Sequence, residues 1–329
     1  MYNVQGYIRR CLNSIFNQDF KDYELILVDD GSTDNTIDEA REVISKASKE
    51  QISKIILKDN SGASATRNLG IREAKGEFII FMDADDQMSN DALSVMDKTT
   101  CQSEADLYVF SLKKEINGVI VESELTKVDS FYIEEINSVR CLEKYLESTR
   151  YIITWQPWSK VFRKNIIKDN NIEFDTTLHS CNDFNFFMKY FLNVRTVSFT
   201  NTPTTIYSVD RPGSISGTKL QRRFESSTKA YSDMFNRIKC SGVESPVLLD
   251  YMSYLYLCSF DLVTQMSREQ IEKVDVIVND NLEIFYYSNN SISRLRRILF
   301  KALGYKKGAQ AVSLIRYITN HFRKGNSEI

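Results

Sequence analysis

Short apolar runs alternate with helix-like stretches through the first hundred residues. Between residues 4 and 16, apolar side chains recur every three or four positions, which is typical of an amphipathic helix. Three later runs are apolar enough to be strands, at residues 23–28, 52–57 and 78–82. Each is followed by a stretch that favours helix. Strands and helices that alternate in this way predict an α/β fold with a parallel, doubly wound sheet.

The third apolar run, Phe78–Met82, ends in a cluster of acids. It is too short for a helix and lacks the polar positions of a strand with one wet face, so we expect a central strand buried on both faces. Asp83, Asp85 and Asp86 then lie at its carboxyl end, where open α/β sheets bind ligands. Asp83 and Asp85 could hold a divalent cation that also contacts substrate phosphates. A turn and helix cap is the simpler interpretation, but neighbouring acids repel each other unless a cation or donors compensate.

The pattern changes after residue 102. We expect a strand at 107–112 and a hairpin that turns at Asn117 and Gly118. Nearly everything beyond residue 218 is predicted to be helical. Between these regions we predict helices at 134–148, 159–167 and 182–192, and extended segments at 194–199 and 205–209.

The composition indicates a protein that folds without disulfide bonds or a structural metal. The chain has 329 residues, 42% of them hydrophobic, which is enough for a full core. Its six cysteines show no paired spacing and it has only two histidines, so neither a disulfide framework nor a zinc site is indicated. No signal peptide opens the chain, and no apolar run approaches the roughly 18 to 20 residues needed to span a bilayer. We therefore expect a cytoplasmic protein.

Residues 291–329 form a basic tail. They hold nine Lys or Arg and one acid, a charge of +8, which leaves −10 for residues 1–290. Their apolar residues recur at helical spacing, so we expect amphipathic helices of the kind that lie on anionic membrane surfaces. The alternative is a solvated basic face on a helix that packs against the rest of the protein. Nucleic acid is a poorer partner, because the acidic remainder would oppose a phosphate backbone.

Several separated motifs, in order along the chain, resemble the family 2 glycosyltransferases with the GT-A fold. The resemblance fades after about residue 220. It implies a glycosyltransferase domain at 1–217, with a nucleotide-binding half at about 1–112 and an acceptor half at about 113–217, and a helical region at 218–329. The matching pieces are Tyr2-Asn3, SIFNQDFKDYELILVDDGSTDNT at 14–36, GASATRNLGIREAKGEFIIFMDADD at 62–86 and, more loosely, WQPWSKVFRKNII at 155–167, NDFNFFMKYF at 182–191 and YSVDRPGSIS at 207–216.

The resemblance also implies an activity. Such enzymes take a sugar from a nucleotide diphosphate, with uracil the expected base, and invert its anomeric carbon. The acceptor would be a hydroxyl of a saccharide or lipid-linked saccharide, as in cell-surface polysaccharide synthesis. Mn²⁺ or Mg²⁺ is the implied cofactor, because a cation neutralises the charge that develops on the leaving diphosphate. Together with the basic tail, this suggests a cytoplasmic enzyme at the inner face of the membrane.

By residue-to-residue match, the resemblance assigns five positions to the donor. Tyr2 would stack on the nucleobase, and Asp30 would hydrogen-bond to it. Arg67 would face the phosphates, which suits its permanent charge and planar fork. Asp83 would contact the ribose, and Asp85 would hold the metal between the two phosphates. Plainer interpretations are a core aromatic for Tyr2, a turn or cap for the acids and an inert surface arginine.

The resemblance assigns the general base to Asp183, at the start of the helix predicted at 182–192. The base would take the proton of the acceptor hydroxyl as that hydroxyl attacks the sugar. Family members have Glu-Asp where this chain has Asn182-Asp183, so the base keeps its place but loses a charged neighbour. An ordinary helix cap is the plainer interpretation of this pair.

Family members also begin with a strand that leads into the Tyr-Asn pair and lies in the middle of the sheet. Here Met1 directly precedes Tyr2. We therefore expect either a start that lacks about eight to ten residues, the length of a strand with its lead-in, or a defective site.

Three other classes of protein share part of the pattern. Receiver domains also place acids after strands, but they are much shorter than this chain and need a lysine after a later strand. Phosphatases that use the first Asp of a DxD pair follow it with Gly and Thr or Val, where this chain has Asp86 and Gln87. A catalytically impaired, sugar- or partner-binding scaffold of the same fold is the third alternative, and the missing strand motivates it.

Overall fold

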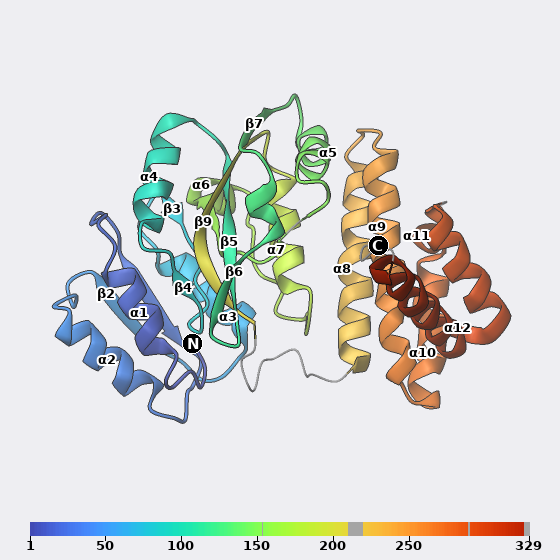
Figure 1. Cartoon of the computed structure of the whole chain (residues 1–329), viewed down its shortest axis with the longest axis horizontal. Coiled ribbons are helices and arrows are strands. Elements are labelled where there is room, and N and C mark those ends of the chain that lie inside the picture. Colours follow the sequence, from blue (N-terminus) through green and yellow to red (C-terminus); the bar gives the residue numbers. More distant parts are fainter. Residues whose placement is uncertain (153, 210–219, 289, 326–329) are drawn as a thin grey trace. The chain divides into compact units, whose positions relative to one another are not determined.

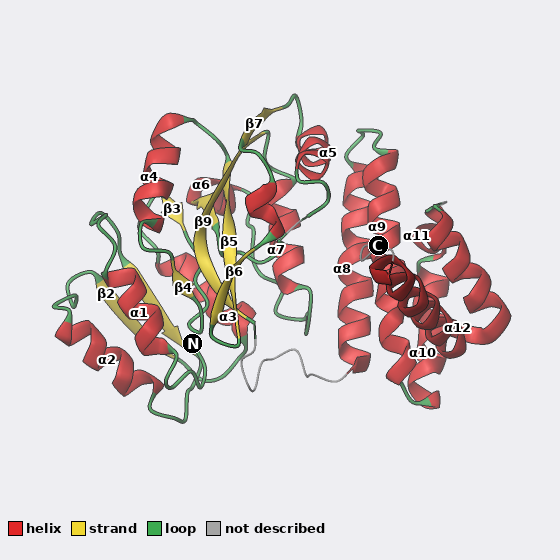
Figure 2. Cartoon of the chain, viewed as in Figure 1, coloured by secondary structure: helices red, strands yellow, loops and turns green. Residues whose placement is uncertain are grey.

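The computed structural model describes residues 1–152, 154–209, 220–288 and 290–325. The chain divides into two compact units (Figure 1). Unit 1 comprises residues 1–176 and 182–214, and unit 2 comprises residues 177–181 and 215–329. The described residues of unit 1 combine strands and helices, whereas those of unit 2 form helices and no strand (Figure 2).

Unit 1 opens with the predicted alternation of helices and strands, which is confirmed through residue 73. Its helices are α1 Ile8–Phe16, α2 Thr36–Lys46, α3 Ala63–Glu73, α4 Ala92–Gln102, α5 Ser138–Ser148, α6 Lys164–Asp169 and α7 Asn182–Phe191, with a short 3-10 helix, η1, at Glu124–Lys127. Its strands are β1 Leu25–Asp29, β2 Ser53–Leu57, β3 Phe78–Ile79, β4 Gln87–Met88, β5 Leu107–Ile116, β6 Val119–Glu122, β7 Phe131–Glu134, β8 Lys160–Arg163 and β9 Thr196–Ser208.

The strands form two sheets. β1 and β2 pair in parallel as a two-stranded sheet. The other seven form a sheet of order β3-β8-β5-β9-β4, with β6 on β5 and β7 on β9. Among the described pairs of this larger sheet, only β5 with β9 is parallel. The α/β fold class is as expected, but the larger sheet is mixed rather than mostly parallel. β8 runs antiparallel to its neighbours β3 and β5, and β6 runs antiparallel to β5.

The prediction of a buried central strand at 78–82 was wrong. β3 is limited to Phe78–Ile79, ends the order of its sheet and, among the described strands, pairs only with β8. Of the five apolar residues, only Ile79 is buried. A run this apolar is buried completely only when strands lie on both sides of it, and β3 has a partner on one side.

The amino terminus lies beside β1, at one edge of the two-stranded sheet. The Met1 amine donates to the Val28 carbonyl at 2.6 Å, and the Met1 carbonyl accepts from the Asp30 N–H at 2.8 Å. Met1 therefore pairs with β1 as a residue of a neighbouring strand would. In the described part of the chain no strand lies between β1 and β3, which is where the family resemblance led us to expect one.

The segment at 159–167, predicted to be helical, instead forms β8 followed by α6. Val161 and Phe162 are both buried because β8 lies between β3 and β5. The two extended segments predicted after residue 193 belong to one strand, β9.

The predicted hairpin at the end of β5 is confirmed. Asn117 and Gly118 connect β5 to β6 with φ angles of 50° and 76°. Both values lie in the left-handed region that a type I′ turn requires, and Asn-Gly is the pair that tolerates it best.

An aromatic cluster joins the end of β3 to α7. The Phe81 ring lies edge-on to the rings of Phe162, Phe174 and Phe186, with centroids 5.5 to 5.7 Å apart. Phe174 and Phe186 stack on each other at 4.0 Å. Because Phe186 belongs to α7, this packing fixes the start of α7 relative to the acids that follow β3.

Unit 2 is built around Phe260, whose ring contacts those of Phe224, Phe285 and Phe300. The fully buried Arg296 donates to Asp261 at 2.7 Å. Within the described residues, no helix is long and apolar enough to cross a membrane. The helices are α8 Leu220–Cys240, α9 Pro246–Ser259, the 3-10 helix η3 Phe260–Gln265, α10 Arg268–Asp280, α11 Leu282–Tyr287 and α12 Ser291–Gly325, which is interrupted by a left-handed Gly304.

Candidate active site

The three acids after β3 lie in one loop, residues 83–86, called here the acidic loop. Asp83 and Asp85 are partly exposed, whereas Asp86 is 1% exposed. Oδ1 of Asp86 accepts from the Ser208 N–H at 2.8 Å, and its Oδ2 has no hydrogen-bond partner among the described residues. Burial, reinforced by the charges of Asp83 and Asp85, raises the pKa of Asp86 to about 8. Asp86 therefore anchors the loop from inside, and the other two acids remain accessible.

Arg67 of α3 joins the acidic loop to α7. Its Nη2 donates to Asp83 Oδ1 and its Nη1 donates to Asp183 Oδ1, both at 2.8 Å. The guanidinium also lies over the Phe174 ring, 5.3 Å from the centroid. Burial alone would lower the pKa of Arg67, but the charges of the two carboxylates raise it above its usual range. Arg67 is thus a permanent cation held between two acids from distant parts of the sequence.

Asp183 lies in the first turn of α7, the position predicted for it. Its neighbour Asn182 donates to Ser64 Oγ of α3 at 2.5 Å, a second link between the two helices. Burial raises the pKa of Asp183 above its usual range, while the charge of Arg67 acts against this rise. The amino end of a helix also favours the ionised carboxylate. The proton affinity of Asp183 therefore depends on its contact with Arg67.

Lys160 of β8 is a second cation near α7, and the sequence analysis did not single it out. Its side chain is fully buried, and Nζ donates to the Gln156 carbonyl at 2.7 Å and to Thr154 Oγ1 at 3.2 Å. Nζ also lies 5.2 Å from the ring centroid of Phe187, one turn along α7 from Asp183. Burial lowers the pKa of Lys160 to about 7, and the charge of Asp183 opposes this. The signal in the sequence was a lysine directly before a short apolar pair.

Asp30 follows β1 and is almost completely buried. Its Oδ1 accepts from the Ser61 N–H at 2.8 Å and from Lys58 Nζ, and its Oδ2 accepts from the Gly62 N–H at 2.9 Å. Burial alone would raise the pKa of Asp30, but these donors lower it. Asp30 therefore holds the loop before α3 through three donors, and a carboxylate has the capacity to accept about one more.

The amino terminus lies where the predicted donor residues meet. Burial lowers the pKa of the Met1 amine, and the charges of Asp30, Asp83 and Arg67 all act on it. Tyr2 follows at once and is 45% exposed, so its side chain is accessible to a ligand. The structure therefore gathers the predicted residues Tyr2, Asp30, Arg67, Asp83, Asp85 and Asp183 in one region of unit 1.

The acidic loop offers oxygen ligands for a hard cation, but it does not build a complete cage. Within the described residues, no group of three or more His, Cys, Asp or Glu side chains forms a metal site. Asp83 Oδ1 is bound to Arg67, and Asp86 is buried. Asp85 carries a carboxylate of the kind that Mg²⁺ and Mn²⁺ prefer. These residues fit a cation that takes its remaining ligands from substrate phosphates and water.

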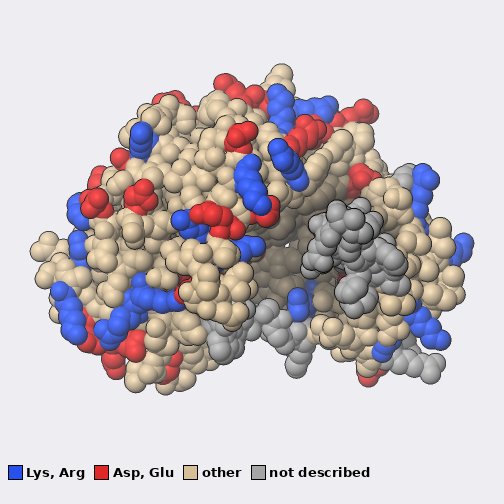
Figure 3. Space-filling model, viewed as in Figure 1, with Lys and Arg blue, Asp and Glu red and all other residues tan. Residues whose placement is uncertain are grey.

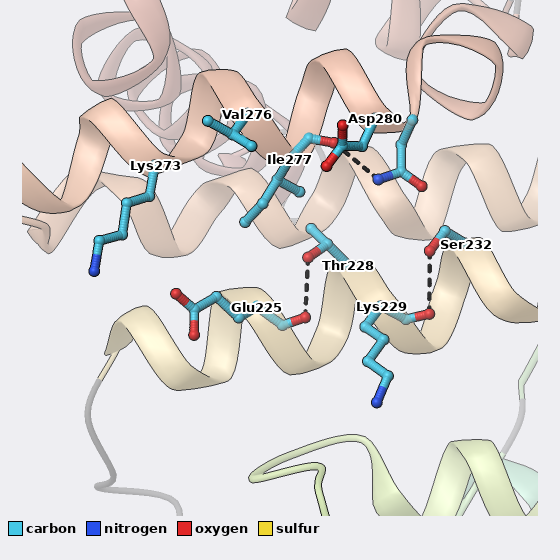
Figure 4. Close-up of a pocket in the computed structure, with 9 residues that line it drawn as sticks. Glu225, Thr228, Lys229, Ser232, Lys273, Val276, Ile277 and Asp280 are labelled. Atoms are coloured by element: carbon cyan, nitrogen blue, oxygen red, sulfur yellow. Dashed lines mark hydrogen bonds between the residues drawn. The ribbon is translucent and has the colours of Figure 1, made fainter.

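A groove of about 460 Å³ lies in unit 2 between α8 and α10 (Figure 4). Three of the polar side chains that line it are satisfied by main-chain carbonyls one turn earlier. Thr228, Ser232 and Asn281 each donate to a main-chain carbonyl three or four positions earlier, at 2.8 to 3.1 Å. The sequence motifs lead to none of the residues that line this groove, and the candidate site lies in unit 1.

Comparison with known proteins relates the chain to one family. The family model described as glycosyl transferase family 2 matches residues 1–190. Poly(ribitol-phosphate) beta-N-acetylglucosaminyltransferase TarS of Staphylococcus aureus is 31% identical over 216 residues, which cover 64% of this chain and 35% of that protein. Poly(ribitol-phosphate) beta-glucosyltransferase of Bacillus spizizenii is 27% identical over 266 residues, which cover 79% of this chain and 39% of that protein. The chain thus spans less than half the length of either relative.

A solved structure resembles nearly the whole chain. The S. aureus TarS fragment 1–349 in complex with UDP-GlcNAc matches with a TM-score of 0.72 and 21% identity, covering 96% of this chain and 90% of that one. Identity this low establishes the fold and nothing more. The chain therefore has the GT-A fold that its motifs led us to expect.

Replacing Arg67 with Met should raise the pKa of Asp183. The substitution removes the positive charge that favours the carboxylate, while burial and the charge of Asp83 continue to oppose ionisation. Carbon-13 NMR of the Asp carboxyl groups across a pH titration measures the effect, with Asp183→Asn identifying the resonance. Arg72→Met is the control, because Arg72 is an exposed arginine on the same helix that pairs with Glu173. An Asp183 pKa that is equal in both variants would contradict the assignment.

Proposed function

Because the chain belongs to glycosyl transferase family 2, we propose that it moves a sugar from a UDP-sugar to a hydroxyl of a saccharide or lipid-linked saccharide. The observation that carries the proposal is the Arg67 bridge between Asp83 and Asp183. Asp83 is assigned to the donor and Asp183 to the acceptor. A transfer in one step needs donor and acceptor groups held side by side, and this bridge provides that arrangement.

Two findings support the donor and acceptor classes. The matched TarS structure holds UDP-GlcNAc, so its fold accommodates a UDP-sugar. Both named relatives carry poly(ribitol-phosphate) in their names, a polymer that offers hydroxyl groups. A hydroxyl-bearing cell-surface polymer or its lipid-linked precursor is therefore the acceptor we propose for this chain.

The proposed reaction is a single displacement. Asp183 accepts the proton of the acceptor hydroxyl while the hydroxyl oxygen forms a bond to the anomeric carbon. The bond from that carbon to the diphosphate oxygen breaks, and its electron pair leaves with UDP. Attack and departure occur on opposite faces, so the configuration inverts. Arg67 assists by keeping Asp183 ionised and by fixing one of its oxygens.

Asp85 is the proposed holder of Mn²⁺ or Mg²⁺. When bound, such a cation would neutralise the charge that develops on the leaving diphosphate. Tyr2 and Asp30 are the proposed nucleobase contacts, and Asp83 is the proposed ribose contact. Tyr2 suits this role because it is exposed, and Asp30 would accept from the base with the capacity that its loop hydrogen bonds leave.

Asp85→Asn should abolish the gain in UDP affinity that Mn²⁺ provides and leave the fold intact. An amide oxygen is a much weaker ligand for a hard cation than a carboxylate. Isothermal calorimetry with UDP, in Mn²⁺ and in chelator, measures that gain. Asp91→Asn is the control, because Asp91 is exposed and its side chain makes no capping hydrogen bond. Unchanged Mn²⁺-dependent binding in Asp85→Asn would remove Asp85 from the metal site.

Asp183→Asn should lower kcat by about 10² to 10⁴, the usual contribution of a general base. Donor affinity should stay within a few-fold, because the nucleotide contacts lie on other residues. In the unsubstituted protein, activity should fall as the pH drops through the raised pKa of Asp183. Asp169→Asn, at the exposed end of α6, is the control for steady-state kinetics. Weaker donor binding with an intact kcat would show that Asp183 is a ligand and not the base.

We also propose that unit 2 docks on an anionic membrane surface through α12. One face of its first half is buried through Arg296 and Phe300, and the opposite face exposes Leu295 and Ile298 beside Arg294. Several Lys and Arg side chains show along the outer rim of unit 2 in the visible face (Figure 3). An exposed apolar stripe flanked by cations matches the chemistry of an anionic bilayer surface. The side chains of residues 316–329, the end of the basic tail, lie outside the described residues.

Ile298→Glu should reduce binding to vesicles that contain phosphatidylglycerol, because it places a charge in the apolar stripe. The matched control is Val276→Glu on α10, since the two residues are 63% and 59% exposed and the change in charge is the same. Deleting residues 291–329 would be a poorer test because it also removes Arg296 and Phe300 from the core. Cosedimentation at low salt, where attraction is strongest, measures binding. Equal binding by both variants would show that the stripe is merely solvated.

A further inference from the structure

The main chain of the acidic loop is also held by residues other than Arg67. The Asp85 carbonyl accepts from Arg10 Nη2 at 2.9 Å and from Ser208 Oγ at 3.0 Å. Ser208 also donates its N–H to Asp86 Oδ1 at 2.8 Å. Two consecutive residues of the loop are therefore fixed by side chains and main chain that come from α1 and from the end of β9.

Arg10 is itself held in place. Its Nη1 donates to Glu115 Oε2 of β5 at 2.8 Å, and Nη2 also contacts Ser208 Oγ. The guanidinium lies 5.5 Å from the ring centroid of Tyr7, one turn earlier on α1. Ser208 Oγ, which has a single proton to donate, also lies 3.3 Å from Glu115 Oε2. A carboxylate, a hydroxyl and an aromatic ring thus orient the fork that reaches the Asp85 carbonyl.

We propose that Arg10 is a positioning residue for the metal anchor: with Glu115 and Ser208, it fixes the main chain of Asp85 so that the carboxylate meets the donor diphosphate and its cation. This inference rests on the role proposed for Asp85. Residues that hydrogen-bond to a metal ligand, without contacting the metal, typically contribute about 10- to 100-fold in metal affinity. Arginine suits the task because its planar fork serves Glu115 and the carbonyl at once, which a lysine ammonium cannot do with the same geometry.

A purely structural role makes a different prediction. If Arg10 only tied α1 to the sheet, its loss would lower the melting temperature and weaken all UDP binding equally. A positioning role instead affects the part of the UDP affinity that Mn²⁺ adds. The ratio of the dissociation constants in chelator and in Mn²⁺ isolates this part.

The test is calorimetry of UDP binding to the full chain as Arg10→Met, Arg10→Lys and Arg9→Met. Arg9 is the matched control, because it is the adjacent arginine of α1 but pairs with Glu42 on the surface. We expect Arg10→Met to lose about 10- to 100-fold of the Mn²⁺-dependent gain, with binding in chelator unchanged. Arg10→Lys should recover part of this loss, and Arg9→Met should match the unsubstituted protein.

Equal Mn²⁺-dependent gains in Arg10→Met and Arg9→Met would overturn the proposal. Should Arg10→Met fail to fold, Ser208→Ala tests the same point, since it removes one donor to the Asp85 carbonyl and should also reduce the gain. If the unsubstituted protein gains nothing from Mn²⁺, the metal role of Asp85 fails and Arg10 loses its role with it. If Asp85→Asn abolishes the gain but neither Arg10→Met nor Ser208→Ala reduces it, only the inference about Arg10 fails.

Discussion

The two ion pairs of Arg67 are the contact on which the rest of the site depends. Asp83 and Asp183 carry like charges, and a cation between them is what allows both to stay ionised so close together. The contact also has a geometric effect, because it joins α3, the acidic loop and α7 through one rigid guanidinium. The ring of Phe174 packs against that guanidinium. Phe174 also belongs to the aromatic cluster that packs α7 against the end of β3.

Positively charged side chains lie near the carboxyl groups of the site. The acidic loop and Asp183 gather four carboxyl groups, and three cations face them: Arg67, Arg10 and the buried Lys160. Burial raises the pKa of Asp86 to about 8, so its carboxyl group is mostly protonated at pH 7. The loss of this negative charge reduces repulsion within the loop. Asp83 is bound to Arg67 and Asp86 is buried, and we assign the cation to the partly exposed Asp85.

Local patterns predicted the start of unit 1 well. The order β1, α2, β2, α3 follows from apolar runs and helical periodicity, and these signals are contained within each element. The pattern failed at β3, because burial of that strand depends on partners that the run itself does not specify. It also failed at β8, whose four residues are too few to show alternation and become a strand only between β3 and β5.

In the candidate site, too, the sequence indicated residues in local motifs but not contacts between distant residues. Asp85 and Asp183 follow recognisable motifs, so the sequence pointed to them directly. That Arg67 meets Asp183 could not be foreseen, since the two are 116 positions apart. Arg10 and Lys160 were missed for the same reason, because their roles depend on tertiary contacts; the apolar pair that follows Lys160 was the one local signal for it.

The central claim is that this chain catalyses inverting transfer from a UDP-sugar. The most direct measurement is NMR of the protein with Mn²⁺, a panel of α-linked UDP-sugars and a polyol phosphate acceptor, following the phosphorus signal of UDP and the anomeric proton of the product. Inverting transfer should release UDP with one donor and form a new β linkage. A product that retains the α configuration would contradict the single displacement by Asp183. A folded protein that binds UDP but releases none from any donor would instead be a sugar-binding scaffold.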